Sequence, residues 1–252
     1  MKKVVFCRCI YSDAIDERRK KRILALLMGS DLDCEFVDDL CDMAARCDSR
    51  LCEWAREDHL VLVACHSRAL RWLFRLAGAR LDPKKATVVN MHRTDAKQRL
   101  RDVLGETLLM EIPSGLNPGQ TVTEPDWIPW FPVIDYDRCR SCGKCVDFCL
   151  FGVYGTGEDG TVKVTNPSQC KNLCPACSRI CPEQAVIFPK FTQEPYNGAE
   201  IELFQYDTRD DPRESGRVLS AEEEDREYQA LLNRKRTNRK RLFGDDANGD
   251  EA

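Results

Sequence analysis

The chain has 252 residues, of which 42% are apolar and 32% are charged, and these values are typical of a globular protein rather than a disordered one. The net charge is −4, from 38 basic and 42 acidic residues, so composition gives no chain-wide reason to expect nucleic acid or an anionic membrane as a partner. The longest apolar stretches, such as Leu60–Cys65, are far shorter than the about 18 residues of a membrane span. We therefore expect an untargeted cytoplasmic protein with one or two domains.

The unusual feature of the composition is its 15 cysteines. Their odd number and the lack of a secretory signal argue against disulfides and favour metal or redox chemistry. Seven lie in the first 65 residues and eight lie between residues 139 and 181. This grouping predicts a cysteine-containing domain at 1–110, a linker at 111–132, a second domain at 133–190 and a polar tail at 191–252.

The first domain alternates between β-like and helix-like segments. We expect strands at Val4–Phe6, Cys34–Val37, Leu60–Ala64 and Thr87–Val89, and helices near 16–28, 42–57, 67–77 and 95–104. Four such βα units predict an α/β domain with a parallel sheet and flanking helices. In this architecture, ligands bind at the carboxyl ends of the strands, near the point where the strand order reverses.

Four cysteines follow the strand ends of this domain and form a candidate metal site: Cys7, Cys9, Cys41 and Cys65. Soft ligands in this number suit an iron–sulfur cluster or zinc equally, and free or redox-exchanging thiols are the alternative. The position of Cys41 depends on a predicted strand boundary, so Cys47 is its obvious substitute. The other cysteines, Cys34, Cys47 and Cys52, are interpreted as small buried hydrophobic residues.

The arginines and histidines of the first domain can each be interpreted in two ways. The helix at 67–77 carries Arg68, Arg71 and Arg75, which form either a solvated stripe or, at Arg68, a charge that offsets a thiolate-bound cluster. His59, His66 and His92 are isolated in the sequence, which favours satisfied or exposed side chains over metal ligands.

The linker at 111–132 is rich in proline and glycine, so it cannot continue a helix or a central strand. Its Trp127, Trp130 and Phe131 are apolar, and we expect them to pack against a domain.

The second group of cysteines has a highly specific spacing. Cys139, Cys142, Cys145 and Cys149 spell C-x2-C-x2-C-x3-C, and Cys170, Cys174, Cys177 and Cys181, followed by Pro182, spell C-x3-C-x2-C-x3-C-P. Zinc prefers two separated C-x2-C pairs, whereas triplets with a remote fourth cysteine suit [4Fe–4S] cubanes. The motif therefore favours two iron–sulfur clusters over two zinc sites.

Residues 133–190 resemble the bacterial-type ferredoxins that carry two [4Fe–4S] clusters in a small α+β domain. The resemblance implies that the last cysteine of each run binds the other cluster. The first cluster would then be held by Cys139, Cys142, Cys145 and Cys181, and the second by Cys170, Cys174, Cys177 and Cys149. Two features depart from the family: the second run opens with C-x3-C, and Leu150 stands where proline is usual.

The segments around the motif agree with this interpretation. Val133–Tyr136 and Ala185–Phe188 are β-prone, and Glu158–Gly160 has the composition of a hairpin turn. Small residues, namely Ser141, Gly143, Ala176 and Ser178, stand where backbone N–H groups could approach cluster sulfurs.

The first domain more loosely resembles the N-terminal domain of the flavin-binding subunit of heterodisulfide reductase, through Val5–Cys9 and Val61–Cys65. In that family, a C-x-C at the first strand end and a cysteine closing a later strand accompany an iron–sulfur cluster. The resemblance implies a related redox module without the flavin, since no G-x-G-x-x-G follows a strand. Together with the neighbouring ferredoxin-like segment, it favours a third iron–sulfur cluster at the N-terminal cysteines.

We therefore expect an electron-transfer protein rather than an independent enzyme, because no nucleophile–base pair or phosphate loop is present. It would pass single electrons to or from a stably associated oxidoreductase of heterodisulfide-reductase-like type. The alternative is a protein whose N-terminal cysteines perform thiol/disulfide exchange or deliver clusters, supplied with electrons by the second domain. A charged helix is expected in the tail from Ser220 onward.

Overall fold

The computed structural model describes residues 2–105 and 127–201, here called the first part and the second part. Both belong to one compact unit that runs from Met1 to Ile201. The helix predicted from Ser220 and most of the predicted linker lie outside the described residues. Within these two ranges, no helix is long and apolar enough to cross a membrane.

The first part is built on a four-stranded parallel sheet in the order β2-β1-β3-β4. Its strands are β1 (Lys3–Cys7), β2 (Asp33–Val37), β3 (Leu60–Ala64) and β4 (Ala86–Asn90). All five residues of β3 are buried, as is typical of a parallel strand covered on both faces. The strand order reverses between β1 and β3, so the carboxyl ends of these two strands lie side by side.

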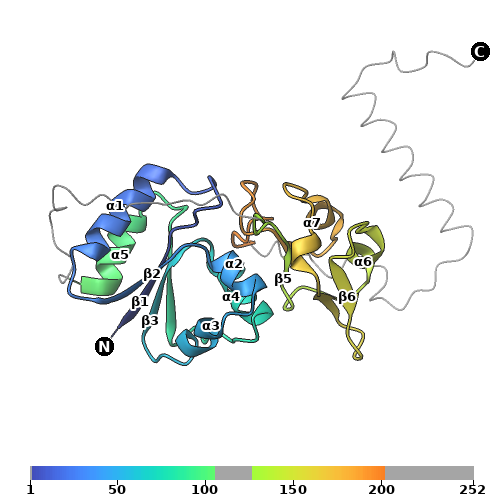
Figure 1. Ribbon diagram of the computed structural model, residues 1–252, viewed down its shortest axis with the longest axis horizontal. Coiled ribbons are helices and arrows are strands. Elements are labelled where there is room, and N and C mark those ends of the chain that lie inside the picture. The colour runs from blue at the N-terminus through green and yellow to red at the C-terminus, as the bar shows by residue number, and fades with distance from the viewer. Residues whose placement is uncertain (1, 106–126, 202–252) are drawn as a thin grey trace, which may run out of the picture. The chain divides into compact units, whose positions relative to one another are not determined.

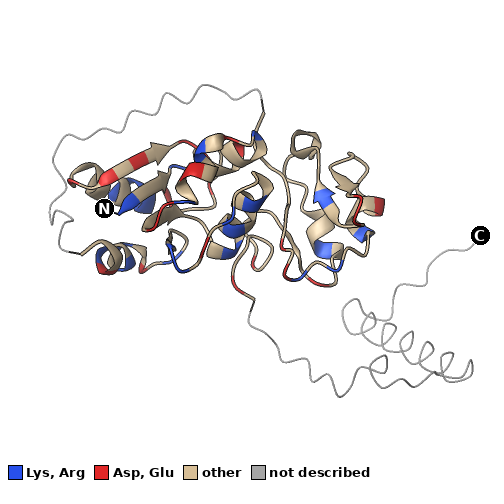
Figure 2. Ribbon diagram, turned by 90° about the horizontal axis from the view of Figure 1, so that it is seen from below, with Lys and Arg blue, Asp and Glu red and all other residues tan. Residues whose placement is uncertain are grey.

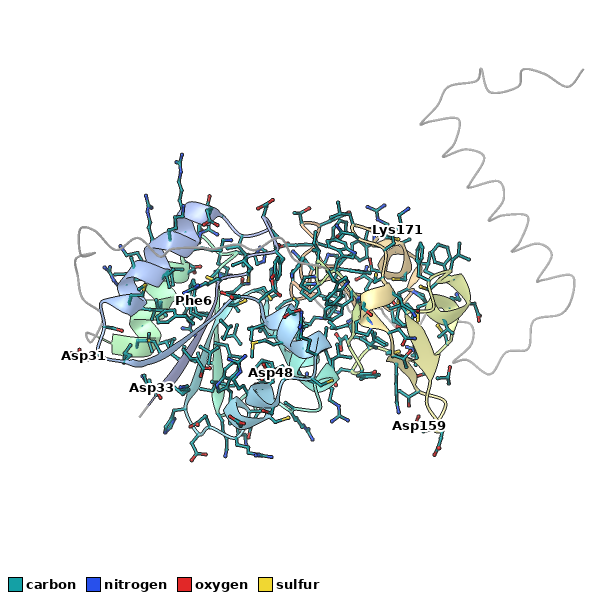
Figure 3. The ribbon with its side chains drawn as sticks, in the orientation of Figure 1. Phe6, Asp31, Asp33, Asp48, Asp159 and Lys171 are labelled. Carbon is teal, nitrogen blue, oxygen red and sulfur yellow. The ribbon has the colours of Figure 1, made fainter. Side chains whose placement is uncertain are left out.

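Helices cover both faces of this sheet (Figure 1). The helices α1 (Glu17–Met28) and α5 (Ala96–Leu104) lie on one face, and α2 (Leu40–Ala45), α3 (Ser49–Trp54) and α4 (Ser67–Leu76) lie on the other. The predicted α/β architecture is therefore observed. Phe6 of β1 is 1% exposed and lies in the interior, as Figure 3 shows.

The single helix predicted at 42–57 is wrong, because the chain forms two short helices there. Cys47 adopts a left-handed conformation with φ of 52°, which interrupts the helix. Asp48 then accepts a hydrogen bond from the backbone N–H of Arg50 and starts α3. An aspartate in this capping position favours a helix start over continuation of the preceding helix.

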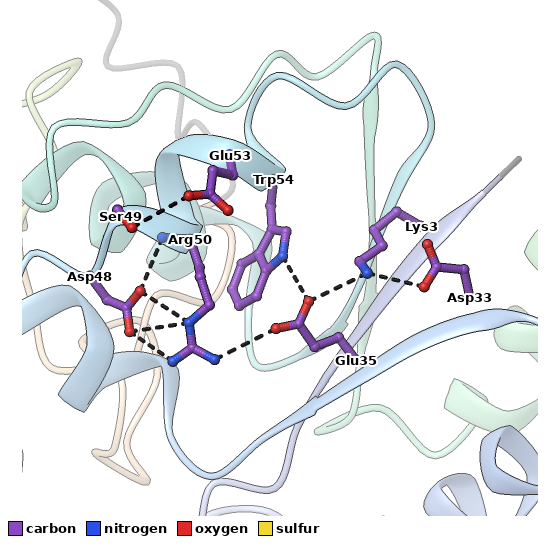
Figure 4. A network of polar contacts seen from close by, with 8 residues as sticks. All are labelled: Lys3, Asp33, Glu35, Asp48, Ser49, Arg50, Glu53 and Trp54. Atoms are coloured by element: carbon purple, nitrogen blue, oxygen red, sulfur yellow. Dashed lines mark hydrogen bonds and ion pairs between the residues drawn. The ribbon is translucent and has the colours of Figure 1, made fainter.

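A polar network fixes α3 against the edge strand β2 (Figure 4). Arg50 bridges Asp48 and Glu35, and the indole Nε1 of Trp54 donates to Glu35 at 3.1 Å. Lys3 of β1 pairs with Glu35 at 3.4 Å. These contacts hold the end of the sheet opposite to the carboxyl edge.

The second part is a small α+β domain with an internal repeat. Its elements are β5 (Val133–Ile134), α6 (Lys144–Phe148), β6 (Tyr154–Thr156), β7 (Val162–Val164), a 3-10 turn η2 (Pro167–Gln169), α7 (Ala176–Ile180) and β8 (Val186–Ile187). β5 pairs antiparallel with β8, and β6 pairs antiparallel with β7 through the predicted hairpin. Each half of the repeat thus contributes one strand to each pair and one short helix.

Aromatic side chains pack the second part internally and against the first. Trp130 stacks on Phe188 with ring centroids 5.3 Å apart. Phe131 joins the core of the first part, and Trp72 of α4 meets Tyr136 edge-on at 5.5 Å. The aromatic residues at the end of the predicted linker therefore pack as expected.

Candidate metal centres

Four cysteines of the second part line one cavity: Cys139, Cys142, Cys145 and Cys181. The loop between β5 and α6, with the first turn of α6, supplies the first three, and Cys181 follows α7. The loop is shaped by Gly143, which begins α6 with φ of 76°, a conformation that favours glycine. Backbone N–H groups point at two of the sulfurs, from Ser141 to Cys139 Sγ at 3.4 Å and from Ala185 to Cys181 Sγ at 3.3 Å.

The other four cysteines line a second cavity of about 500 Å³: Cys149, Cys170, Cys174 and Cys177. The phenol of Tyr154 donates to Cys177 Sγ at 3.0 Å. Each cavity therefore combines three cysteines of one run with the last cysteine of the other. The structure brings together the two sets that the resemblance implied.

The sulfurs within each set interact electrostatically. Burial and the charges of Cys139 and Cys181 raise the pKa of Cys145 to about 11. Burial and the charges of Cys177, Cys174 and Cys149 raise the pKa of Cys170 to about 12. Bound iron would offset this repulsion, because ligand binding requires the thiolate form and a cation stabilises it.

The two departures from the family pattern leave the tetrads intact. Leu173 precedes Cys174 and has φ of 59°, and Ser141 has φ of 51° in the same place before Cys142. The inserted residue thus enlarges the loop but keeps the turn before the second cysteine. Leu150 lines the mouth of the second cavity with a side chain that is 92% exposed, and Leu173 is 72% exposed and lies outside that lining.

The four N-terminal candidates are all buried at the carboxyl edge of the parallel sheet. Cys7 ends β1, Cys65 directly follows β3, and Cys41 lies in the first turn of α2. Cys9 has φ of 47°, and its sulfur lies 3.0 Å from the sulfur of Cys7. The backbone N–H of Leu40 donates to Cys7 Sγ at 3.4 Å.

Burial and neighbouring thiols raise the pKa of three of these cysteines in the same direction. Burial and the charge of Cys7 raise the pKa of Cys65 to about 12. Burial raises the pKa of Cys41 well above its ordinary value, and the charges of Cys65 and Cys7 add to this. The contact with Cys7 and burial raise the pKa of Cys9 in the same direction.

The remaining N-terminal cysteines lie elsewhere. Cys34 lies near the hydroxyl of Ser30 at 4.0 Å, and the sulfur of Cys52 faces the carbonyl of Ala77 at 3.8 Å. Both are partly buried, whereas Cys47 is exposed. The interpretation of Cys47 as a buried hydrophobic residue is therefore wrong, because the break between α2 and α3 turns it outward.

No three His, Cys, Asp or Glu side chains in the described ranges are arranged to hold a single metal ion. A cubane makes a different geometric demand, since its four thiolates bind four separate irons around a larger core. In the second part, each tetrad lines one cavity, as a cubane with four ligands requires. Each of the three sets consists of four thiols, the donor type that iron–sulfur clusters take.

Arg68 is not part of a solvated stripe, and its role beside a cluster stays a prediction. Its side chain is 8% exposed and donates to Asp135 Oδ2 at 2.6 Å and to the carbonyl of Gln184 at 2.6 Å. Arg71, on the same face of α4, pairs with Asp137 at 2.5 Å. Arg68 and Arg71 therefore contact the second part, and Arg68 neutralises a carboxylate there, while Arg71 and Arg75 stay exposed as the predicted stripe implies.

Two of the histidines that are isolated in the sequence lie together in the fold. His66 and His92 stack with ring centroids 4.5 Å apart, and Asn90 Nδ2 lies 3.0 Å from His66 Nδ1. Burial lowers the pKa of both imidazoles to about 4, so they are neutral near pH 7. His66 directly follows Cys65 in the chain.

Sequence reasoning missed one charged pair at this edge. Lys190 of the second part reaches Asp39 of the first part, with 2.7 Å between Nζ and Oδ2, and both side chains are buried. The partners are 151 residues apart in the chain, so no local pattern signals the contact.

Comparison with known proteins agrees with the geometry of the second part. Residues 131–184 match the family described as the 4Fe-4S dicluster domain. An uncharacterized ferredoxin of Methanocaldococcus jannaschii is 51% identical over 63 residues, which are 25% of this chain and 42% of that protein. The chain therefore spans less than half the length of that relative.

Two shorter relatives are covered almost whole. Pyruvate synthase subunit PorD of Methanocaldococcus jannaschii is 30% identical over 71 residues, which are 27% of this chain and 80% of that protein. Ferredoxin-3 of Nostoc sp. is 31% identical over 83 residues, which are 26% of this chain and 84% of that protein. The chain belongs to the bacterial-type ferredoxin family and carries a 4Fe-4S dicluster domain at residues 131–184.

Proposed function

We propose that the protein is an electron-transfer subunit that passes single electrons to or from a partner oxidoreductase of heterodisulfide-reductase-like type. The observation that carries the proposal is the grouping of eight cysteines into two tetrads, each lining its own cavity in the dicluster domain. A [4Fe–4S] cluster supplies one-electron redox chemistry when bound, with a potential set by hydrogen bonds, charge and solvent exposure.

We assign the first cluster to Cys139, Cys142, Cys145 and Cys181, and the second to Cys170, Cys174, Cys177 and Cys149. Around these ligands, the chain supplies hydrogen-bond donors that act on sulfur. The amides of Ser141 and Ala185 serve the first set, and the phenol of Tyr154 serves the second. Such donors stabilise negative charge on sulfur and so favour the reduced state.

We further propose that Cys7, Cys9, Cys41 and Cys65 bind a third iron–sulfur cluster. The support is their common burial and their place at the carboxyl edge of the sheet, where the strand order reverses. The second candidate function is thiol/disulfide exchange, favoured by the 3.0 Å separation of the Cys7 and Cys9 sulfurs. Exchange requires access for an attacking thiolate, and these sulfurs are buried, which favours the cluster.

Two observations support a subunit role. One of the relatives is named as a subunit of an enzyme, and the α/β part has the cysteine arrangement that resembles the flavin-binding subunit of heterodisulfide reductase. The cytoplasmic setting stays a prediction. The domain boundaries at 1–110, 111–132, 133–190 and 191–252 stay a prediction.

An anaerobic titration of the full chain with a one-electron reductant tests the proposal. We expect reversible uptake of about one electron per cluster, followed by EPR, and return of these electrons to an oxidised dye or to a heterodisulfide-reductase-type oxidoreductase. A protein that binds zinc at the tetrads, or that takes up no electrons reversibly, would contradict the assignment.

A further inference from the structure

Lys190 is a buried cation that the second part places beside the N-terminal cysteines. It follows β8 and Pro189, and its side chain is 7% exposed. The ammonium pairs with Asp39, whose side chain is 2% exposed, and lies 5.4 Å from the ring centroid of Tyr11. A lysine is rarely buried to this extent without a negative partner.

Asp39 connects this cation to the N-terminal set. Its Oδ1 accepts hydrogen bonds from the backbone N–H groups of Cys41 at 2.9 Å and Asp42 at 3.1 Å, as the N-cap of α2. Its Oδ2 accepts from Lys190 at 2.7 Å. One carboxylate therefore fixes both the turn that carries Cys41 and the position of the ammonium.

Lys190 therefore holds a positive charge one carboxylate away from the turn that carries Cys41. A positive charge at this place favours the addition of an electron to a thiolate-bound centre, and burial limits screening by water and salt.

We infer that Lys190 sets the reduction potential of the N-terminal centre, so that the ferredoxin-like part completes this centre with its compensating charge. The inference rests on the proposed third cluster. In this role, Lys190 places a positive charge near the cluster and does not bind iron. It also gives the two parts of the chain a shared redox site, in addition to their shared packing.

The test uses the full chain and an EPR-monitored redox titration of each cluster. We expect Lys190→Met to move the midpoint potential of the N-terminal cluster to a more negative value, and Lys190→Arg to keep it near that of the unchanged protein. Asp39→Asn, which removes a negative charge, should move the midpoint in the opposite direction. The two clusters of the second part should keep their potentials.

Lys85→Met is the matched control, because Lys85 also pairs with an aspartate at 2.7 Å, Asp58, but at the opposite edge of the sheet and in an exposed position. It should leave all potentials unchanged. The inference is overturned if Lys190→Met behaves like Lys85→Met, or if Lys190→Met and Asp39→Asn shift the midpoint in the same direction.

Iron content separates this inference from the proposal on which it rests. About twelve irons in the unchanged chain and about eight in Cys65→Ser establish the third cluster. With that result, an unshifted potential in Lys190→Met overturns the role of Lys190 alone. About eight irons in both proteins overturn the third cluster and the inference together.

Discussion

At the scale of single residues, loss of the Arg68–Asp135 pair should lower the free energy of unfolding more than loss of any other contact described above. Both side chains are buried, and Arg68 also binds the carbonyls of Gln184 and Pro195. Arg68→Ala leaves the Asp135 carboxylate buried without its partner, so we expect a loss of about 3–5 kcal/mol in the free energy of unfolding. Anaerobic urea denaturation, followed by circular dichroism, measures this loss.

Arg93→Ala is the control for that measurement, because the Arg93–Asp95 pair is exposed and such pairs contribute little. Its urea midpoint should match that of the unchanged protein. Equal midpoints for Arg68→Ala and Arg93→Ala would show that the buried pair does not hold the two parts together.

Tyr154 provides a second test at this scale. Tyr154→Phe removes the hydrogen bond to Cys177 Sγ while keeping the ring, so the second cluster should remain bound with a more negative midpoint potential. Tyr136→Phe is the matched control, since Tyr136 donates to the carbonyl of Val162 at 3.2 Å and to no sulfur. Redox titration with EPR distinguishes the clusters, and identical potentials in the two variants would remove the assigned role of Tyr154.

At the scale of elements, the last cysteine of each run lines the cavity of the other run. Cys149 follows α6 but lines the cavity of the second run, and Cys181 follows α7 but lines the cavity of the first run. We expect Cys181→Ser to damage the first cluster and Cys149→Ser to damage the second. EPR of the reduced variants measures this, and loss of the same signal in both would refute the pairing.

The elements also show what a sequence can and cannot predict. The four strands of the first part were predictable, because parallel strands between two helical layers are short apolar runs. The two cysteine tetrads were predictable, because their cysteines recur at fixed spacings in two similar runs of the sequence. The break between α2 and α3 was missed, because the capping preference of Asp48 competes with helical periodicity over the same few residues.

Contacts between the two parts could not be predicted. Lys190 meets Asp39 across 151 residues, and Arg68 meets Asp135 across 67 residues. In the sequence, nothing distinguishes these residues from ordinary charged residues at a protein surface. They are buried because the second part packs on α4 and on the sheet edge. The sequence of α4 showed its basic face but not which surface that face binds.

At the scale of the whole molecule, the distribution of charge determines how strongly association with a partner protein depends on salt. Basic and acidic residues are mixed along the described chain (Figure 2), and Leu150, Leu173 and Phe148 are exposed near the second tetrad. Association steered by charge depends steeply on salt, whereas apolar contact does not. We therefore expect electron-transfer rates with the partner to change little between low and physiological salt. A several-fold decrease over that range would indicate a diffusing carrier instead.

The central claim is that three groups of four cysteines each hold a cluster. Anaerobic determination of iron and acid-labile sulfide in the full chain, with EPR of the reduced protein, tests it most directly. The claim predicts about twelve irons and about twelve sulfides per chain, and EPR signals from three centres. About eight of each would reduce the protein to a two-cluster ferredoxin with an α/β domain whose cysteines are thiols, and zinc in place of iron would contradict the account altogether.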